Sequence, residues 1–193
     1  YKTVFFTLGI LQIILGLSMI VPILAQFFYD QIDSGFIGSG VVTIIFGVLF
    51  FLSNLDHNNK LTLPQAFLLT ALSWLSIAIF GSLPFIFSNI ELSITDAFFE
   101  SMSGITTTGS TIITNLNETP KAILLWRAML QWLGGIGIIV MAITLMPIMN
   151  IGGMQLFVIS TSNTPEKILP KSKEISFRLI LVYMALTFIC AVF

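Results

Sequence analysis

Long apolar stretches with few charges constrain this chain more than any other feature of its sequence. A helix needs about 20 apolar residues to cross the hydrocarbon core of a bilayer, which is about 30 Å thick. The mean hydropathy is +1.00, and only 9% of the 193 residues are charged. We therefore predict an all-α membrane protein with transmembrane helices at residues 4–28, 36–52, 63–87, 120–146 and 175–193.

The same composition argues against several classes of function. A formal net charge of −1 does not favour a nucleic-acid partner. The one histidine, His57, is expected in a solvated turn on the opposite side of the membrane from Ser103 and Ser110, so no nucleophile can reach it. One histidine and one cysteine, Cys190, are too few for a metal site of the usual composition. We predict that the protein is not an enzyme.

The two ends of the sequence suggest a piece of a longer protein. The chain opens with Tyr1 rather than methionine, and its first apolar run is too long for a signal peptide. It stops at Phe193 inside an apolar run, with no glycine, proline or charge to end the helix. We expect an N-terminal fragment.

Local signals predict where the helices begin, end and pack. Thr62 is a plausible N-cap before the third span. Thr119 is the expected N-cap of the fourth span, which Pro147 should end. Pro84 is expected to bend the third span. Small residues let membrane helices approach closely, so packing roles are predicted for Gly9, Gly16, Gly134, Gly135 and Gly137.

The distribution of lysine predicts the orientation of the chain. The connections at 53–62 and 147–174 carry four lysines, whereas those at 29–35 and 88–119 carry no lysine or arginine. Because cytoplasmic loops are enriched in basic residues, the first pair and the N-terminus are predicted to be cytoplasmic. Two basic residues near the outer end of the fourth span argue against this assignment.

The segment between the third and fourth spans, residues 88–119, predicts a half-helix. Ser93 followed by Asp96 matches a helix-capping pattern, and Gly104 is expected to end the helix after Ser103. Such a helix reaches about 15 Å, half of the hydrocarbon core. Its phenylalanines are too apolar for water, so we expect it to enter the membrane and the chain to return, as a re-entrant loop.

The returning segment has the composition of a cation-selectivity filter. Backbone at membrane depth is tolerated only when it is buried in protein or lines a watery cavity. Threonine carbonyls and hydroxyls can replace the water around a potassium ion without adding formal charge, and a glycine permits positive φ. The half-helix would direct the negative end of its dipole at the ion. The predicted filter residues are Thr106, Thr107, Thr108, Gly109 and Ser110.

Other interpretations of this segment stay open. The threonine run could be an ordinary polar loop on the outer surface. The G-x-x-x-x-G spacing from Gly104 to Gly109 resembles a phosphate-binding loop, but the lysine that holds phosphate is missing. Acidic residues on this side would raise the local cation concentration or would simply be solvated; they are Glu91, Asp96, Glu100 and Glu118.

Arg127 lies about two turns into the fourth span, where an unpaired charge is costly. Glu100 on the half-helix is the hypothesised partner for a supporting ion pair. The alternative is that the arginine extends to the outer interface beside Trp126.

Three stretches resemble the membrane subunit of Trk-type potassium uptake systems, the TrkH family of the Trk/Ktr/HKT superfamily. They are LPFIFSNIELSITDAFFESMSGITTTGSTII, ILLWRAMLQWLGGIGIIVMAITLMPI and IGGMQLF. The resemblance implies four repeats of helix, pore loop and helix in one polypeptide, arranged pseudo-fourfold around a potassium pathway. Residues 1–61 then correspond to an extra N-terminal helix pair, 62–146 to the first repeat, 147–174 to a cytoplasmic connection and 175–193 to the start of the second repeat.

The resemblance also implies a transport function, a cellular location and partners. It predicts channel-like or cation-coupled (symport) potassium uptake across the bacterial cytoplasmic membrane. It implies a homodimer of full-length subunits in the lipid bilayer and a cytoplasmic nucleotide-binding regulatory subunit. The sequence contains one filter loop where the family architecture needs four. Two alternatives therefore stay open: a short channel subunit that forms tetramers with one filter per chain, and a non-conducting membrane scaffold.

Overall fold

The computed structural model describes residues 1–29, 33–55, 62–88, 90, 92–149 and 168–192. The regular structure in these ranges is entirely α-helical. The chain divides into two units, Tyr1–Gly135 and Ile136–Phe193, with the boundary inside the helix Lys121–Met149. The helices are α1 (Lys2–Ser18), α2 (Ile20–Phe28), α3 (Gly35–Ser53), α4 (Leu63–Phe87), α5 (Ile94–Ile105), α6 (Lys121–Met149) and α8 (Ile168–Val192).

Four helical stretches are long and apolar enough to cross a membrane, namely Lys2–Phe28, Gly35–Ser53, Pro64–Phe87 and Lys121–Ile139. They coincide with the first four predicted spans, so the expected all-α membrane fold is confirmed. In the last predicted span the described apolar helix, Phe177–Val192, is shorter than these four.

The first span is divided at Met19 into α1 and α2. Pro22 explains the division, because proline has no N–H to donate to the carbonyl of Ser18 and its ring crowds that carbonyl. The Met19 N–H turns instead to the carbonyl of Gly16, at 3.2 Å. The predicted span over residues 4–28 is confirmed, and the break within it was not predicted.

Two predicted helix ends are wrong. Pro147 was expected to end the fourth span, but α6 continues to Met149. The Thr119 hydroxyl donates to the carbonyl of Asn115 at 2.9 Å, and α6 begins after Pro120, whose carbonyl accepts from the Leu124 N–H. The last helix begins at Ile168, and its apolar part, Phe177–Val192, lies within the predicted span 175–193. Proline near a helix end is a weak signal for its boundary.

Glycines set the distance between α1 and α3. A Cβ added to Gly9 would lie 2.8 Å from the carbonyl oxygen of Gly47, and one added to Gly47 would lie 2.8 Å from the Ile13 nitrogen. A Cβ on Gly16 would lie 2.6 Å from the Ile44 side chain. The predicted packing role of Gly9 and Gly16 is confirmed, and their helix partner is α3.

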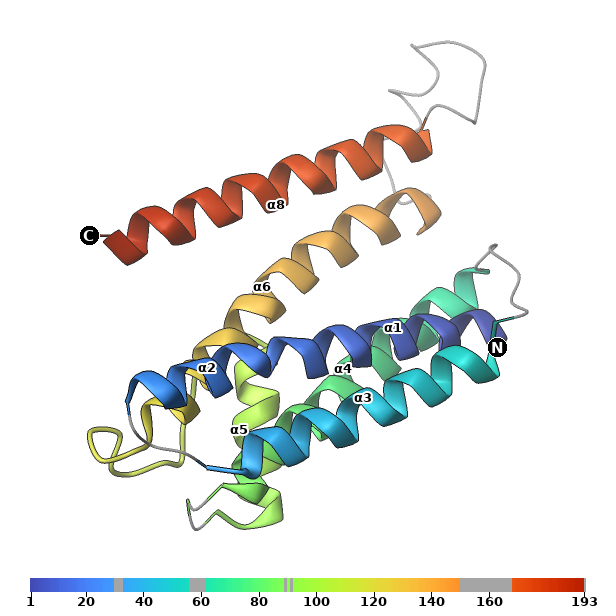
Figure 1. The fold of residues 1–193 in the computed structure, drawn as a ribbon. Coiled ribbons are helices and arrows are strands. Elements are labelled where there is room, and N and C mark those ends of the chain that lie inside the picture. The colour runs from blue at the N-terminus through green and yellow to red at the C-terminus, as the bar shows by residue number, and fades with distance from the viewer. Residues whose placement is uncertain (30–32, 56–61, 89, 91, 150–167, 193) are drawn as a thin grey trace. The chain divides into compact units, whose positions relative to one another are not determined.

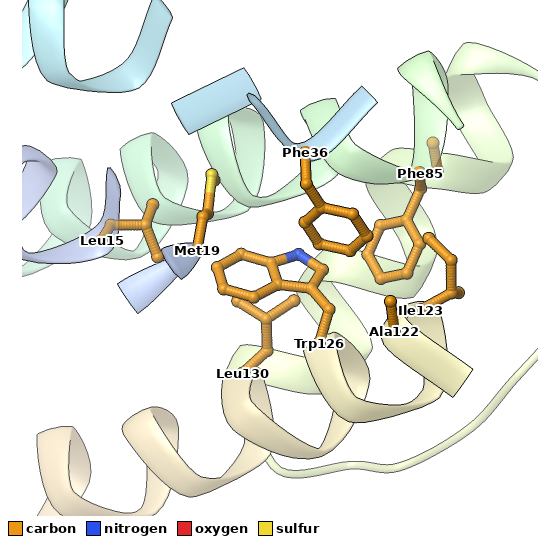
Figure 2. Close-up of a cluster of buried hydrophobic side chains, with 9 residues drawn as sticks. Leu15, Met19, Phe36, Phe85, Ala122, Ile123, Trp126 and Leu130 are labelled. Atoms are coloured by element: carbon orange, nitrogen blue, oxygen red, sulfur yellow. The ribbon is translucent and has the colours of Figure 1, made fainter. Parts of the chain in front are cut away.

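A buried cluster joins the N-terminal helix pair to the helices that follow it (Figure 2). Trp126 of α6 is its largest member and is fully buried, with an edge-on contact to Phe36 of α3 at a centroid distance of 6.3 Å. Its indole Nε1–H donates to the carbonyl of Gly81 in α4 at 2.9 Å. The start of α6 is thereby fixed against both α3 and α4.

Candidate functional site: a re-entrant loop at membrane depth

The half-helix begins where the sequence predicted. The Ser93 hydroxyl accepts a hydrogen bond from the Asp96 N–H at 3.2 Å, and α5 follows from Ile94. The predicted stop at Ser103 is wrong, because the helix continues through Gly104 to Ile105. A Cβ on Gly104 would lie 3.0 Å from the Leu130 Cβ, so this glycine serves the approach of α5 to α6.

The contacts of α5 with α6 place its C-terminal end deep within the span. A Cβ added to Gly134 of α6 would overlap the carbonyl oxygen of Ile105, the last residue of α5. Gly134 lies 13 residues beyond Lys121, about 20 Å along the helix axis at 1.5 Å per residue. The packing role predicted for Gly134 is confirmed. A Cβ on Gly137 meets no atom within 4 Å in the part of the chain that the structure describes.

The chain after α5 runs back beside α6. The nearest side chain to Gly109 is Gln131, 3.9 Å from an added Cβ. Thr111 and Ile112 reach Glu100, which pairs with Arg127. Successive loop residues therefore lie beside successively earlier turns of α6. The short helix enters and the chain returns on the same side, as a re-entrant loop does; Figure 1 shows α5 and the loop that follows it.

The loop backbone has an alternating conformation. Thr107 has φ of 59° and Gly109 has φ of 76°, both in the left-handed region. The positive φ predicted for Gly109 is confirmed, whereas that of Thr107 was not foreseen, because β-branched residues rarely adopt it. The N–H groups of Thr108 and Gly109 both donate to the carbonyl of Ser103, at 3.0 and 3.2 Å.

These bonds leave the loop carbonyls available. No described residue donates a hydrogen bond to the carbonyl oxygens of Thr106, Thr107, Thr108 or Gly109. All four residues are exposed in this chain. Unsatisfied carbonyls at membrane depth require an aqueous cavity or a ligand. Four consecutive carbonyls without a partner are what a cation that has lost its water shell needs.

The hydroxyls of Thr106 and Thr108 and the carbonyl of Ser110 were predicted as ion ligands, but they make hydrogen bonds within the protein. Thr106 Oγ1 donates to the Met102 carbonyl at 2.8 Å and lies 2.9 Å from Thr108 Oγ1, so these hydroxyls are occupied with the loop itself. The Ser110 carbonyl accepts from the Ser103 hydroxyl at 2.7 Å. Of the five predicted filter residues, the first four therefore offer carbonyls that accept no hydrogen bond from the described part of the chain, and Ser110 is held by α5.

The structure brings Glu100 and Arg127 together. Arg127 Nε donates to Glu100 Oε2 at 2.7 Å, and the Glu100 side chain is fully buried. The other carboxylate oxygen, Oε1, accepts from the Thr111 hydroxyl at 2.6 Å and from the Ile112 N–H at 2.7 Å. The alternative of an arginine at the interface beside Trp126 does not fit this geometry, because Trp126 is fully buried.

The remaining candidates lie elsewhere. Asp96 is in the first turn of α5, and the Glu118 carboxylate accepts from the Asn115 side chain at 3.3 Å in the exposed loop. Cys190 is an exposed free thiol on α8. His57, Glu91 and the IGGMQLF stretch lie outside the described residues. No cluster of potential metal-ligating side chains occurs among the residues whose positions are described.

Comparison with known proteins identifies the family of this chain. The family model described as "TrkH: Cation transport protein" matches residues 33–193. The chain belongs to the TrkH family. A Trk system potassium uptake protein TrkH of Vibrio parahaemolyticus is 37% identical over 196 residues, covering 100% of this chain and 40% of the relative. The corresponding protein of Escherichia coli is 40% identical over 187 residues, covering 95% of this chain and 39% of the relative.

A solved structure agrees with this TrkH family assignment. The crystal structure of the potassium transporter TrkH from Vibrio parahaemolyticus superposes with a TM-score of 0.85 at 36% sequence identity. The match covers 99% of this chain and 38% of that one. The chain thus spans about two fifths of the length of the TrkH family members that it matches. These relatives are transporters, in keeping with the prediction that the chain is not an enzyme.

Proposed function

We propose that this chain forms one quarter of a potassium pathway and the helices that support it, within a TrkH family uptake protein. The observation that carries the proposal is the row of carbonyls from Thr106 to Gly109, which accept no hydrogen bond from any described residue. Gly109 in this row lies beside Gln131, in the middle of the candidate span Lys121–Ile139. Carbonyl oxygens without formal charge suit a monovalent ion that must both bind and leave. The names of the relatives support potassium as the transported ion.

The proposed organisation follows the resemblance. Residues 1–61 would be an accessory helix pair, 62–146 the first helix–pore loop–helix repeat, 147–174 a cytoplasmic connection, and 175–193 the start of the second repeat. The remaining repeats would supply the other filter segments, since the exposed Thr106–Ser110 loop is only one side of a pore. The whole protein would be a dimer in the bacterial inner membrane, with an N-terminus in the cytoplasm and a cytoplasmic nucleotide-binding regulator.

The test is rubidium uptake, as a tracer for potassium, by cells that lack their own potassium uptake systems and express the full-length protein. The key variant is Gly109→Ala. Its Cβ has room, because the nearest atom is 3.9 Å away, but φ of 76° is strained for alanine. We expect uptake to fall at least about tenfold, the effect of about 1.4 kcal/mol.

Gly137→Ala is the matched control, because an added Cβ there meets nothing within 4 Å among the described residues. It should keep full uptake at equal expression. Absence of uptake with the unmodified protein would contradict the proposed function, and unchanged uptake with Gly109→Ala would contradict the role of this loop.

A further inference from the structure

We infer that Glu100 is a positioning residue for the ion pathway, and that it contributes to the discrimination between potassium and sodium. This inference rests on the proposed function. It assigns no ion ligand to the carboxylate. Instead, Glu100 holds the chain that leaves the filter, at Thr111 and Ile112, and so fixes the positions of the carbonyls before it.

Burial of the Glu100 carboxylate is energetically costly unless its charge is paired. The Glu100 side chain has no exposed surface and sits in a membrane-embedded half-helix, where an unpaired carboxylate is very unfavourable. Three donors surround it: Arg127 Nε, Thr111 Oγ1 and the Ile112 N–H. The charge is balanced by one arginine, so the pair adds no net charge near the ions.

The three donors to Glu100 come from two different segments of the chain. Thr111 and Ile112 follow the filter directly, and Arg127 belongs to α6. One carboxylate therefore connects the half-helix, the returning chain and the neighbouring span. Hydrogen bonds to a charged acceptor are shorter and about twice as strong as neutral ones. No described residue other than Glu100 bonds to the returning backbone at Ile112.

Ser103, on the same face of α5, makes further hydrogen bonds to the loop. Ser103 lies three residues after Glu100, about one helical turn further along. Its hydroxyl donates to the Ser110 carbonyl, and its own carbonyl accepts from Thr108 and Gly109. The return of the chain is thus held at both ends of a short segment. A small shift at Thr111 would alter the spacing of the carbonyls before Ser110.

The sharpest variant is Thr111→Val, which nearly preserves the shape of the side chain. It removes the hydroxyl that donates to Glu100 and accepts from the Ile113 N–H at 3.1 Å. Thr114→Val is the matched control, being an exposed threonine in the same loop. The measurement is the sodium concentration that halves rubidium uptake by the full-length protein. We expect Thr111→Val to lower this concentration by a factor of about three to ten, which is about 0.7–1.4 kcal/mol and so only part of the value of one hydrogen bond to a charged group. Thr114→Val should leave it unchanged.

A double variant separates positioning from folding. Glu100→Gln alone leaves Arg127 without its partner and can reduce expression, whereas Glu100→Gln with Arg127→Met removes both charges. We expect the double variant to be inserted and to take up rubidium while losing resistance to sodium. Normal resistance to sodium in both Thr111→Val and the double variant would overturn the inference. Absence of uptake by the unmodified protein would instead contradict the proposed function.

Discussion

Thr107 is the residue whose conformation is least expected from its type. A β-branched side chain at φ of 59° is a backbone outlier, and such strain costs on the order of 1–3 kcal/mol. The surrounding hydrogen bonds compensate for it: the Thr107 N–H donates to the Gly104 carbonyl at 2.9 Å, and the next two N–H groups share the Ser103 carbonyl. Strain of this kind persists where the neighbouring structure holds it, as at a ligand site.

Gly81 is the residue on which α4, α5 and α6 meet. Its carbonyl accepts from Trp126, and a Cβ at this position would lie 2.7 Å from the Ser101 hydroxyl oxygen. That buried oxygen has no hydrogen-bond partner among the described residues. The indole N–H of Trp126 is therefore expected to contribute to stability, whereas the Ser101 hydroxyl is not.

We predict that Trp126→Phe lowers the free energy of unfolding by about 1–3 kcal/mol, because it removes the indole hydrogen bond and part of a buried side chain. Ser101→Ala should be neutral or stabilising, since it removes a buried hydroxyl without a partner. Thermal unfolding of the purified full-length protein in detergent measures both. A larger loss for Ser101→Ala than for Trp126→Phe would contradict this account.

At the scale of elements, the approach of α5 to α6 determines where the filter lies. Gly104 and Gly134 allow this approach, the first against Leu130 and the second against the backbone of Ile105. Membrane helices gain little from the hydrophobic effect against lipid, so close packing of small residues is important for their association. The depth of the loop follows from the position of Gly134 along α6.

We predict that Gly134→Ala is strongly destabilising, because its Cβ cannot be accommodated without moving the end of α5 away from α6. The control is Gly137→Ala in the same helix, which should be neutral or gain up to about 1 kcal/mol from helix propensity. Thermal unfolding and the yield of folded full-length protein are the readouts. Equal stability of the two variants would show that the α5–α6 contact is not as close as described.

At the scale of the whole molecule, unit Tyr1–Gly135 has two ends (Figure 1). At one end, a Cβ on Gly35, the first residue of α3, would lie 2.7 Å from the carbonyl oxygen of Phe87, the last residue of α4. At the other end are the N-terminus, the end of α3 and the start of α4, as Figure 1 shows. We predict that the first end faces outward, because residues 88–119 carry no lysine or arginine and cytoplasmic loops are enriched in them.

We predict that a cysteine at Asn117, an exposed residue of the loop after the filter, reacts with a membrane-impermeant thiol reagent added to intact cells. A cysteine at Ser53, the exposed last residue of α3, should react only after the cells are opened. Both variants are made in full-length protein with Cys190 and any further native cysteines replaced. The reverse pattern of labelling would reverse the orientation.

The sequence alone determined the elements whose causes are local. Apolar length identified the first four spans, and Ser93 identified the start of α5, because a cap and a hydrophobic run act over a few neighbouring residues. It also identified the threonine loop and suggested the pairing of Glu100 with Arg127, since a charge within a span needs a partner. Family resemblance led to the proposal that residues 62–146 form one of several repeats of the whole protein.

Only the tertiary structure decided which loop carbonyls accept no hydrogen bond from the residues that the structure describes. Ser103 holds the Ser110 carbonyl and two loop N–H groups, and Thr111 binds Glu100; neither role has a sequence pattern. Gly104 was predicted to end the helix because glycine is common at helix ends. In the structure it instead lets α5 pack closely against Leu130. Contacts between segments far apart in the chain set these outcomes, and local propensity is too weak to predict them.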